Sequence, residues 1–167
     1  MPQEIRIAAT MQIDATGNPV VGGAVPSISR TKQADIVLMD GTGLNQASKT
    51  YSATRTVAAS ANDDIDLAGV LTDILGLAPL TFLTVKAIVI RAADANVSNL
   101  SVGPAPANGF LGPFNAAADR VTVRPGGAFV IAAPQTGFTV TAGTGDILRV
   151  ANGAGGSATY TIEITGT

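Results

Sequence analysis

The densest group of potential ligand atoms in the sequence is acidic and lies at Asn62-Asp63-Asp64-Ile65-Asp66. Carboxylates are hard oxygen donors of the kind that Ca²⁺ prefers in proteins. The stretch lacks the spacing of an EF-hand loop and the Glu that closes such a loop. We therefore regard Asp63, Asp64 and Asp66 as weak metal candidates and favour a solvated turn that ends in a helix cap. No metal and no other cofactor is expected.

The residue types on which most enzymes depend are missing or isolated. The chain has no His and no Cys, which excludes Ser-His and Cys-His nucleophiles and thiolate metal sites. Glycoside hydrolysis needs two carboxyl groups that flank the bond to be broken. The only two Glu residues, Glu4 and Glu163, fall on the expected outer faces of separate strands. The sequence thus predicts a protein that is not an enzyme, with a glycan hydrolase as a minor alternative.

Charge and hydropathy narrow the classes of partner. The formal net charge is −2, and the ten Lys and Arg residues are scattered rather than clustered, so a nucleic-acid partner is not expected. No apolar stretch is long enough to span a membrane, and no membrane partner is expected. Only 13% of the residues are charged. This low value fits a surface that is partly buried against other subunits, and it fits an ordinary, sparingly charged β protein equally well.

The N-terminal segment has a clear strand pattern. Apolar residues alternate with polar ones from Glu4 to Ile13, which predicts a strand with one apolar face. Its apolar positions Ile5, Ile7, Met11 and Ile13 are our candidates for interface residues. A stretch rich in Gly and Pro, residues 17–26, separates this strand from the remainder of the chain. Residues 1–28 are therefore predicted to be a strand and possible arm that reaches a neighbouring subunit; the alternative is that this strand completes its own sheet.

The remaining residues, 29–167, predict a single all-β domain. Short apolar runs recur between turns rich in Gly and Pro, and the strongest of them, residues 82–93, is apolar on both faces. This spacing is typical of a β-sandwich, with a jelly-roll-like arrangement as the specific expectation. One helix is predicted over Leu67–Leu75, because its Leu, Val and Ile residues recur at helical spacing between Asp66 and Gly76.

Several short stretches of the second part of the chain resemble small virion proteins of tailed bacteriophages, such as head-decoration and fibre-like β-sandwich domains. These stretches are Leu71-Thr72-Asp73-Ile74-Leu75-Gly76, Thr81-Phe82 with Val85-Lys86-Ala87-Ile88, Pro125-Gly126-Gly127-Ala128-Phe129, Gly143-Thr144-Gly145-Asp146-Ile147-Leu148, Asn152-Gly153 and the closing Tyr160-Thr161-Ile162-Glu163-Ile164-Thr165-Gly166. The resemblance covers about two-thirds of the chain by our reading. The first 50 residues carry no such likeness.

The resemblance implies a structural protein of the virion. The leading expectation is a capsid decoration (cement) protein, which binds the assembled shell at capsomer junctions and stabilises it. Its partners would be further copies of itself, as a homotrimer, and the major capsid protein. It would lie on the capsid exterior after assembly in the cytoplasm of a bacterial host. The alternative is a tail fibre or receptor-binding head domain.

Overall fold

A computed structural model of the chain describes residues 4–16, 27–69, 71–72 and 79–167, with side chains described from Ile36 onward. All regular structure in these residues is β. The strands are β1 (Glu4–Thr16), β2 (Ser27–Asp40), β3 (Gln46–Ala47), β4 (Lys49–Val57), β5 (Asn62–Asp66), β6 (Leu71–Thr72), β7 (Pro79–Leu80), β8 (Thr84–Ala92), β9 (Leu100–Pro104), β10 (Val121–Val123), β11 (Ala128–Ala132), β12 (Phe138–Thr139), β13 (Ile147–Asn152) and β14 (Ala158–Gly166). The described residues contain no helix of the length and apolarity that a membrane crossing requires.

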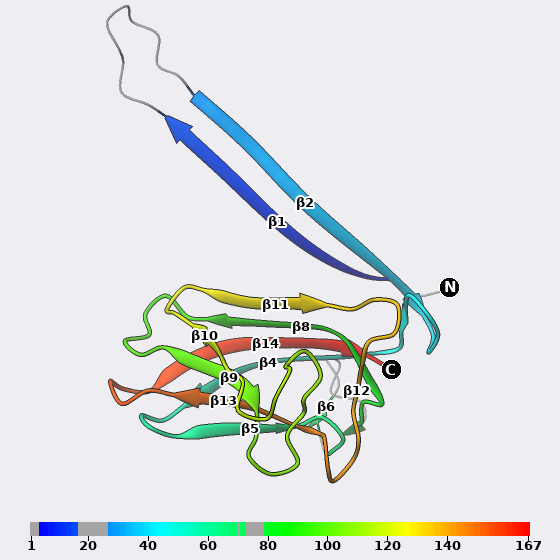
Figure 1. Ribbon diagram of the computed structural model, residues 1–167. Helices are drawn as coiled ribbons and strands as arrows, with labels where there is room; N and C mark the ends of the chain where they lie inside the picture. The colour runs from blue at the N-terminus through cyan, green and yellow to red at the C-terminus, as the bar shows by residue number, and fades with distance from the viewer. Residues whose placement is uncertain (1–3, 17–26, 70, 73–78) are drawn as a thin grey trace, which may run out of the picture.

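Two antiparallel sheets form the body of the molecule, which confirms the predicted all-β sandwich (Figure 1). One sheet has the order β11-β8-β14-β4, with the short β12 also paired to β8, and the other has the order β10-β9-β13-β5. The strand pairs are nested along the chain: β4 pairs with β14, β5 with β13, β8 with β11 and β9 with β10. The eight strands therefore form four antiparallel pairs, each enclosing the next along the chain, and this double strand is folded over to give the two sheets.

The core lies between the two sheets and follows the period of two that strands impose. In β14, Ala158, Tyr160, Ile162 and Ile164 are fully buried, whereas Thr161 and Glu163 are exposed, as the alternation predicts. In β8, Ile88 and Ile90 are fully buried at the centre of the same sheet. Apolar residues from both sheets and from the loops between strands complete this core, the largest being Phe82, Phe110, Ile65, Leu67, Leu100 and Leu148.

The predicted helix over residues 67–75 is wrong for the part of that stretch that the structure describes. Residues 67–69 form a turn, and β6 follows after residue 70; residues 70 and 73–75 lie outside the described residues. The amide of Leu67 donates to the carbonyl of Asp146 (2.9 Å), and the carbonyl of Leu67 accepts from the amide of Phe82 (2.9 Å). Phe82, which is distant in sequence, thus uses the carbonyl that a helix beginning at Leu67 would pair within itself. The apolar side chain of Leu67 is buried in the sandwich core instead.

β1 and β2 form a long antiparallel hairpin, here called the ribbon, that extends away from the sandwich (Figure 1). Its pairs run from Glu4 with Met39 to Thr16 with Ser27. The predicted arm over residues 1–28 contains β1 and only the first two residues of β2, whereas the projecting hairpin continues to Asp40. At the base of the ribbon, Leu38 and Ala47 are almost fully buried, although neither belongs to the sandwich core. Backbone hydrogen bonds join this base to the body, from the amide of Asn45 to the carbonyl of Pro134 (3.0 Å) and from the amide of Ser48 to the carbonyl of Gly166 (2.9 Å).

Candidate functional site

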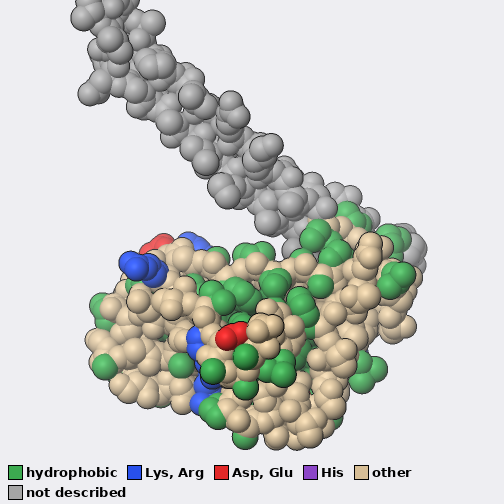
Figure 2. All heavy atoms as spheres, in the orientation of Figure 1, with side chains coloured by type: hydrophobic (Ala, Val, Ile, Leu, Met, Phe, Trp, Pro, Cys, Tyr) green, Lys and Arg blue, Asp and Glu red, His purple; other side chains and the backbone are tan. Residues whose placement is uncertain are grey.

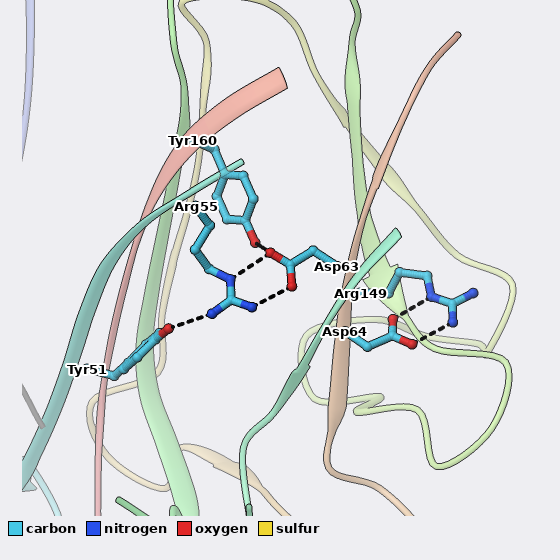
Figure 3. A network of polar contacts seen from close by, with 6 residues as sticks. All are labelled: Tyr51, Arg55, Asp63, Asp64, Arg149 and Tyr160. Carbon is cyan, nitrogen blue, oxygen red and sulfur yellow. Dashed lines mark hydrogen bonds and ion pairs between the residues drawn. The ribbon is translucent and has the colours of Figure 1, made fainter. Parts of the chain in front are cut away.

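A network of hydrogen-bonded polar side chains joins the two sheets at one open edge (Figure 3). Arg55 of β4 lies in one sheet and Asp63 of β5 in the other. The Arg55 Nε and one terminal nitrogen each donate to a different oxygen of the Asp63 carboxylate, both at 2.6 Å. This is the bidentate geometry in which an Arg–carboxylate pair is strongest. The pair therefore ties together two edge strands that share no backbone ladder.

Two tyrosines complete this network. Tyr160 of β14 donates its hydroxyl hydrogen to the Asp63 carboxylate at 2.8 Å, and the second terminal nitrogen of Arg55 donates to the Tyr51 hydroxyl at 3.1 Å. Burial raises the pKa of Asp63, but hydrogen bonds from Arg55 and Tyr160 and the charge of Arg55 outweigh burial, so this pKa lies below its usual value. Burial and the hydrogen bond to Asp63 both raise the pKa of Tyr160. The three groups are thus a carboxylate, a cation and a neutral phenol.

The acidic cluster does not converge on one point. Asp64 follows Asp63 in β5 and points to the other side of the strand, where its carboxylate accepts from Arg149 Nε at 2.6 Å and from a terminal nitrogen at 2.7 Å. Asp66 accepts from the amide of Ala68 at 3.1 Å and so stabilises the turn after β5. No group of three or more potential metal-ligating side chains is present in the described part of the chain. Asp63, Asp64 and Asp66 thus have separate structural partners.

An open hollow of about 330 Å³ lies beside the network. It is lined by Arg55, Thr56, Val57, Ala58, Ala61, Asn62 and Asp63, which belong to β4, β5 and the turn between them. Asp63 is the only carboxylate in this lining, and its pKa is lowered. A glycosidase acid needs a raised pKa and a second carboxyl group close by, so the hollow does not have the groups for that reaction.

Sequence reasoning missed the arginine partners of the acidic cluster. Tyr51, Ala53, Arg55 and Val57 alternate along β4 and face the interior, so Arg55 is a charged residue on an otherwise apolar strand face. Such a residue must find a counter-charge, because an unpaired charge is costly to bury. The place of Arg55 on this strand face could therefore have predicted an ion pair, and the acidic stretch that follows β4 in sequence supplies its partner, Asp63.

The four predicted interface residues lie together in the ribbon. Ile5, Ile7, Met11 and Ile13 occupy alternate positions of β1, opposite Leu38, Ile36, Lys32 and Arg30 of β2. Residues directly opposite in an antiparallel pair share a face, so all four positions belong to one face of the ribbon. Their side chains lie outside the described residues. The only extensive neighbour of β1 among the described elements is β2.

The edge strand β11 is a second candidate surface, which the sequence did not single out. Its sequence, Ala128-Phe129-Val130-Ile131-Ala132, has no charged residue and no Pro. Val130 is 48% exposed on the outer face of the sheet, whereas Phe129 and Ile131 face the core and are only half-buried. Figure 2 shows hydrophobic side chains gathered on the side of the sandwich nearest the ribbon.

Comparison with models of protein families, with curated proteins and with solved structures finds no match to this chain in any of the three.

Proposed function

We propose that the protein is a non-enzymatic structural component of a virion, specifically a capsid decoration protein. In this role it binds the assembled shell at capsomer junctions as a homotrimer, on the capsid exterior, and stabilises the shell. The proposal rests first on the resemblance of residues 71–76, 125–129, 143–148 and 160–166 to tailed-phage virion proteins. The structure adds an observation that favours an assembly role, which is a sandwich with a long projecting ribbon.

The topology of the sandwich supports this proposal. We interpret the nested pairing of β4 with β14, β5 with β13, β8 with β11 and β9 with β10 as a jelly roll. Jelly rolls occur in viral capsid proteins, in lectins and in cupins. A shared fold is an analogy and does not itself assign a function.

The ribbon carries the proposal further than the fold does. A two-stranded hairpin on its own is marginally stable in water. The β1 positions Ile5, Ile7, Ala9, Met11 and Ile13 make the β1 half of one face of this hairpin apolar. A face of this kind is stable when another surface covers it, because burial of apolar area is the main stabilising term in association. For a decoration protein, the shell and the other copies of the protein are surfaces that can cover this face.

Particle binding by the purified protein tests this function. The protein is mixed with preassembled shells of the major capsid protein from the encoding virus, and the shells are pelleted. Decoration predicts saturable co-sedimentation and an increase in the temperature at which the shells rupture. The matched variant lacks residues 1–35, which removes β1 and most of β2 but keeps the buried Leu38. Full-length protein that stays in the supernatant at saturating concentration refutes the proposal.

The hollow beside Arg55 favours a second candidate, a receptor-binding head domain. Arg55, Asn62 and Asp63 offer charged and amide groups around an open depression, and sugar-binding sites combine such polar groups with a concave surface. A glycan array separates the two functions. Specific binding of one glycan class that is lost in Asn62→Ala, with no binding to shells, favours receptor recognition over decoration.

A further inference from the structure

We propose that the free edge of β11 accepts β1 of a second copy of this chain, so that the ribbon of each copy extends the five-stranded sheet of its neighbour. This inference deepens the assembly role proposed above and rests on it for the biological setting only. The geometry of the edge, the pattern of the ribbon and their separation within one chain each support it.

The backbone of β11 has unpaired groups on its outer edge. The amide of Ala92 donates to the carbonyl of Gly127 at 3.0 Å, and the amide of Ala133 donates to the carbonyl of Lys86 at 2.8 Å. Because bonded pairs alternate along an antiparallel ladder, residues 127, 129, 131 and 133 point their backbone groups toward β8. The amides and carbonyls of Ala128, Val130 and Ala132 therefore point away from the sheet, and none of them has a backbone partner among the described residues.

This edge lacks the usual protection against pairing. Natural edge strands carry charges, Pro or bulges that prevent the addition of another strand. β11 has none of the three along Ala128–Ala132, and its register with β8 is regular. On the inner side, Phe129 and Ile131 are half-buried, and Phe129 stacks on Phe114 with ring centroids 6.2 Å apart. A strand added to this edge would cover these side chains as well as satisfy the backbone.

β1 has the pattern that this edge requires. A strand that joins the sheet must continue its apolar inner face and its outer face in alternation. β1 supplies Ile5, Ile7, Ala9, Met11 and Ile13 on one face, and its charged residues fall on the other. β2 is the poorer candidate because Arg30 and Lys32 share the apolar face of the ribbon. The 13 residues of β1 span about 43 Å, ample for the roughly 17 Å of β11.

Arg30 and Lys32 of β2 also argue against an oligomer in which the ribbons of several copies pack on one another. Packing the apolar faces of several ribbons together would bring Arg30 and Lys32 of each copy close to those of the next. Like charges at such a contact are destabilising.

The contact must form between copies rather than within one chain. Figure 1 shows the ribbon leaving the body near β11 and diverging from it along its length. At the base, the amide of Asn45 donates to the carbonyl of Pro134 at 3.0 Å and the amide of Ser48 donates to the carbonyl of Gly166 at 2.9 Å. With the base held in this way, β1 points away from β11 of the same copy. Backbone hydrogen bonds would give affinity in such a contact and side-chain pockets would give specificity, as in other strand additions.

Cross-linking between marked copies tests this contact directly. The chain has no Cys, so Ala8→Cys in one copy and Val130→Cys in another provide single reactive positions, and both positions would lie on the outer face of the extended sheet. A short bismaleimide applied to an equal mixture should give mainly a mixed dimer, identified by mass. Dimers that join Ala8→Cys only to itself would show ribbon-to-ribbon packing and overturn the proposal. A reaction that yields no cross-linked dimer would overturn it as well.

Sedimentation of a charged edge variant provides the second measurement. Val130→Lys places a charge at the free edge, and Val97→Lys is the control, because Val97 is 71% exposed in a loop. We expect oligomers for the wild type and Val97→Lys, and monomers for Val130→Lys with an unchanged melting temperature. A monomeric wild type at high micromolar concentration overturns the inference, as does an oligomeric, folded Val130→Lys.

The two proposals fail separately. Oligomers that cross-link as expected but do not bind shells leave the strand exchange standing and refute decoration. Monomers that still co-sediment with shells refute the strand exchange and the homotrimer, and leave shell binding standing.

Discussion

Asn in place of Asp63 should destabilise the sandwich by removing the link between its two sheets. The carboxylate accepts two hydrogen bonds from Arg55 and one from Tyr160, at 2.6, 2.6 and 2.8 Å. Asparagine has one oxygen, so at least one bond to Arg55 is lost and the guanidinium has no counter-charge. A hydrogen bond to a charged group contributes about 1.5–3 kcal/mol.

The exposure of the pair sets where in this range the loss falls. The Asp63 side chain is 15% exposed, but that of Arg55 is 32% exposed, and solvent screens its remaining charge. We therefore expect Asp63→Asn to lower the free energy of unfolding by about 2–3 kcal/mol. For a chain of this size the melting temperature should fall by about 4–12 °C.

Asp64→Asn is the matched control, because it changes the same chemical group one residue away. Asp64 is 43% exposed and pairs with Arg149 within one sheet, so its loss should cost less than about 1 kcal/mol. Urea unfolding of both variants, followed by circular dichroism, gives the two free energies. Equal losses in the two variants, or a change in Asp63→Asn below about 1 kcal/mol, would refute the view that the Arg55–Asp63 pair secures the edge.

Three further outcomes follow from the same structure. Because folding lowers the pKa of Asp63, the Asp63 carboxylate stabilises the fold above the ordinary Asp pKa of about 3.9, and this stabilisation is lost as the pH falls through the lowered pKa. In acid, the urea midpoint of the wild type should therefore approach that of Asp63→Asn. A wild-type midpoint that stays higher in acid contradicts this prediction. Ile90→Ala should cost about 2–5 kcal/mol in the same assay, because Ile90 is fully buried; a loss below 1 kcal/mol would mean that the core relaxes around the cavity. Gly166→Ala should cost about 1–3 kcal/mol or more, because a Cβ there would collide with the Thr84 carbonyl, whereas Gly145→Ala, where a Cβ makes ordinary contacts, should be nearly neutral.

The strands were predictable because their residues obey a local rule. Burial alternates along β14 from Ala158 to Ile164 as the sequence does. β8 is largely apolar on both faces, and most of its residues are buried. The helix prediction failed because the spacing of Leu67 and its neighbours is a local signal, whereas the backbone partners of Leu67 come from Asp146 and Phe82. Pattern alone does not contain those distant bonds.

The candidate site was only partly predictable for the same reason. The acidic residues at 63, 64 and 66 are visible in the sequence, but the two arginines that engage two of them are 8 and 85 residues away. The alternation of β1 identified one face of the ribbon, but the pairing with β2 that defines the ribbon depends on the register across residues 17–26. The free edge of β11 is a property of strand order, which no short stretch encodes.

The nested strand order also determines when this chain can acquire its fold during synthesis. β14 lies between β4 and β8 and pairs with both, and residues as far apart as Thr56 and Thr159 meet across it. Until the ribosome has released Ala158–Gly166, β4 and β8 each have an open edge where a central strand belongs. Sheets built from such distant pairs form slowly. Nascent chains of this protein therefore pass through a long interval with two exposed internal edges, and crowding of polysomes during that interval favours mispairing between neighbouring chains.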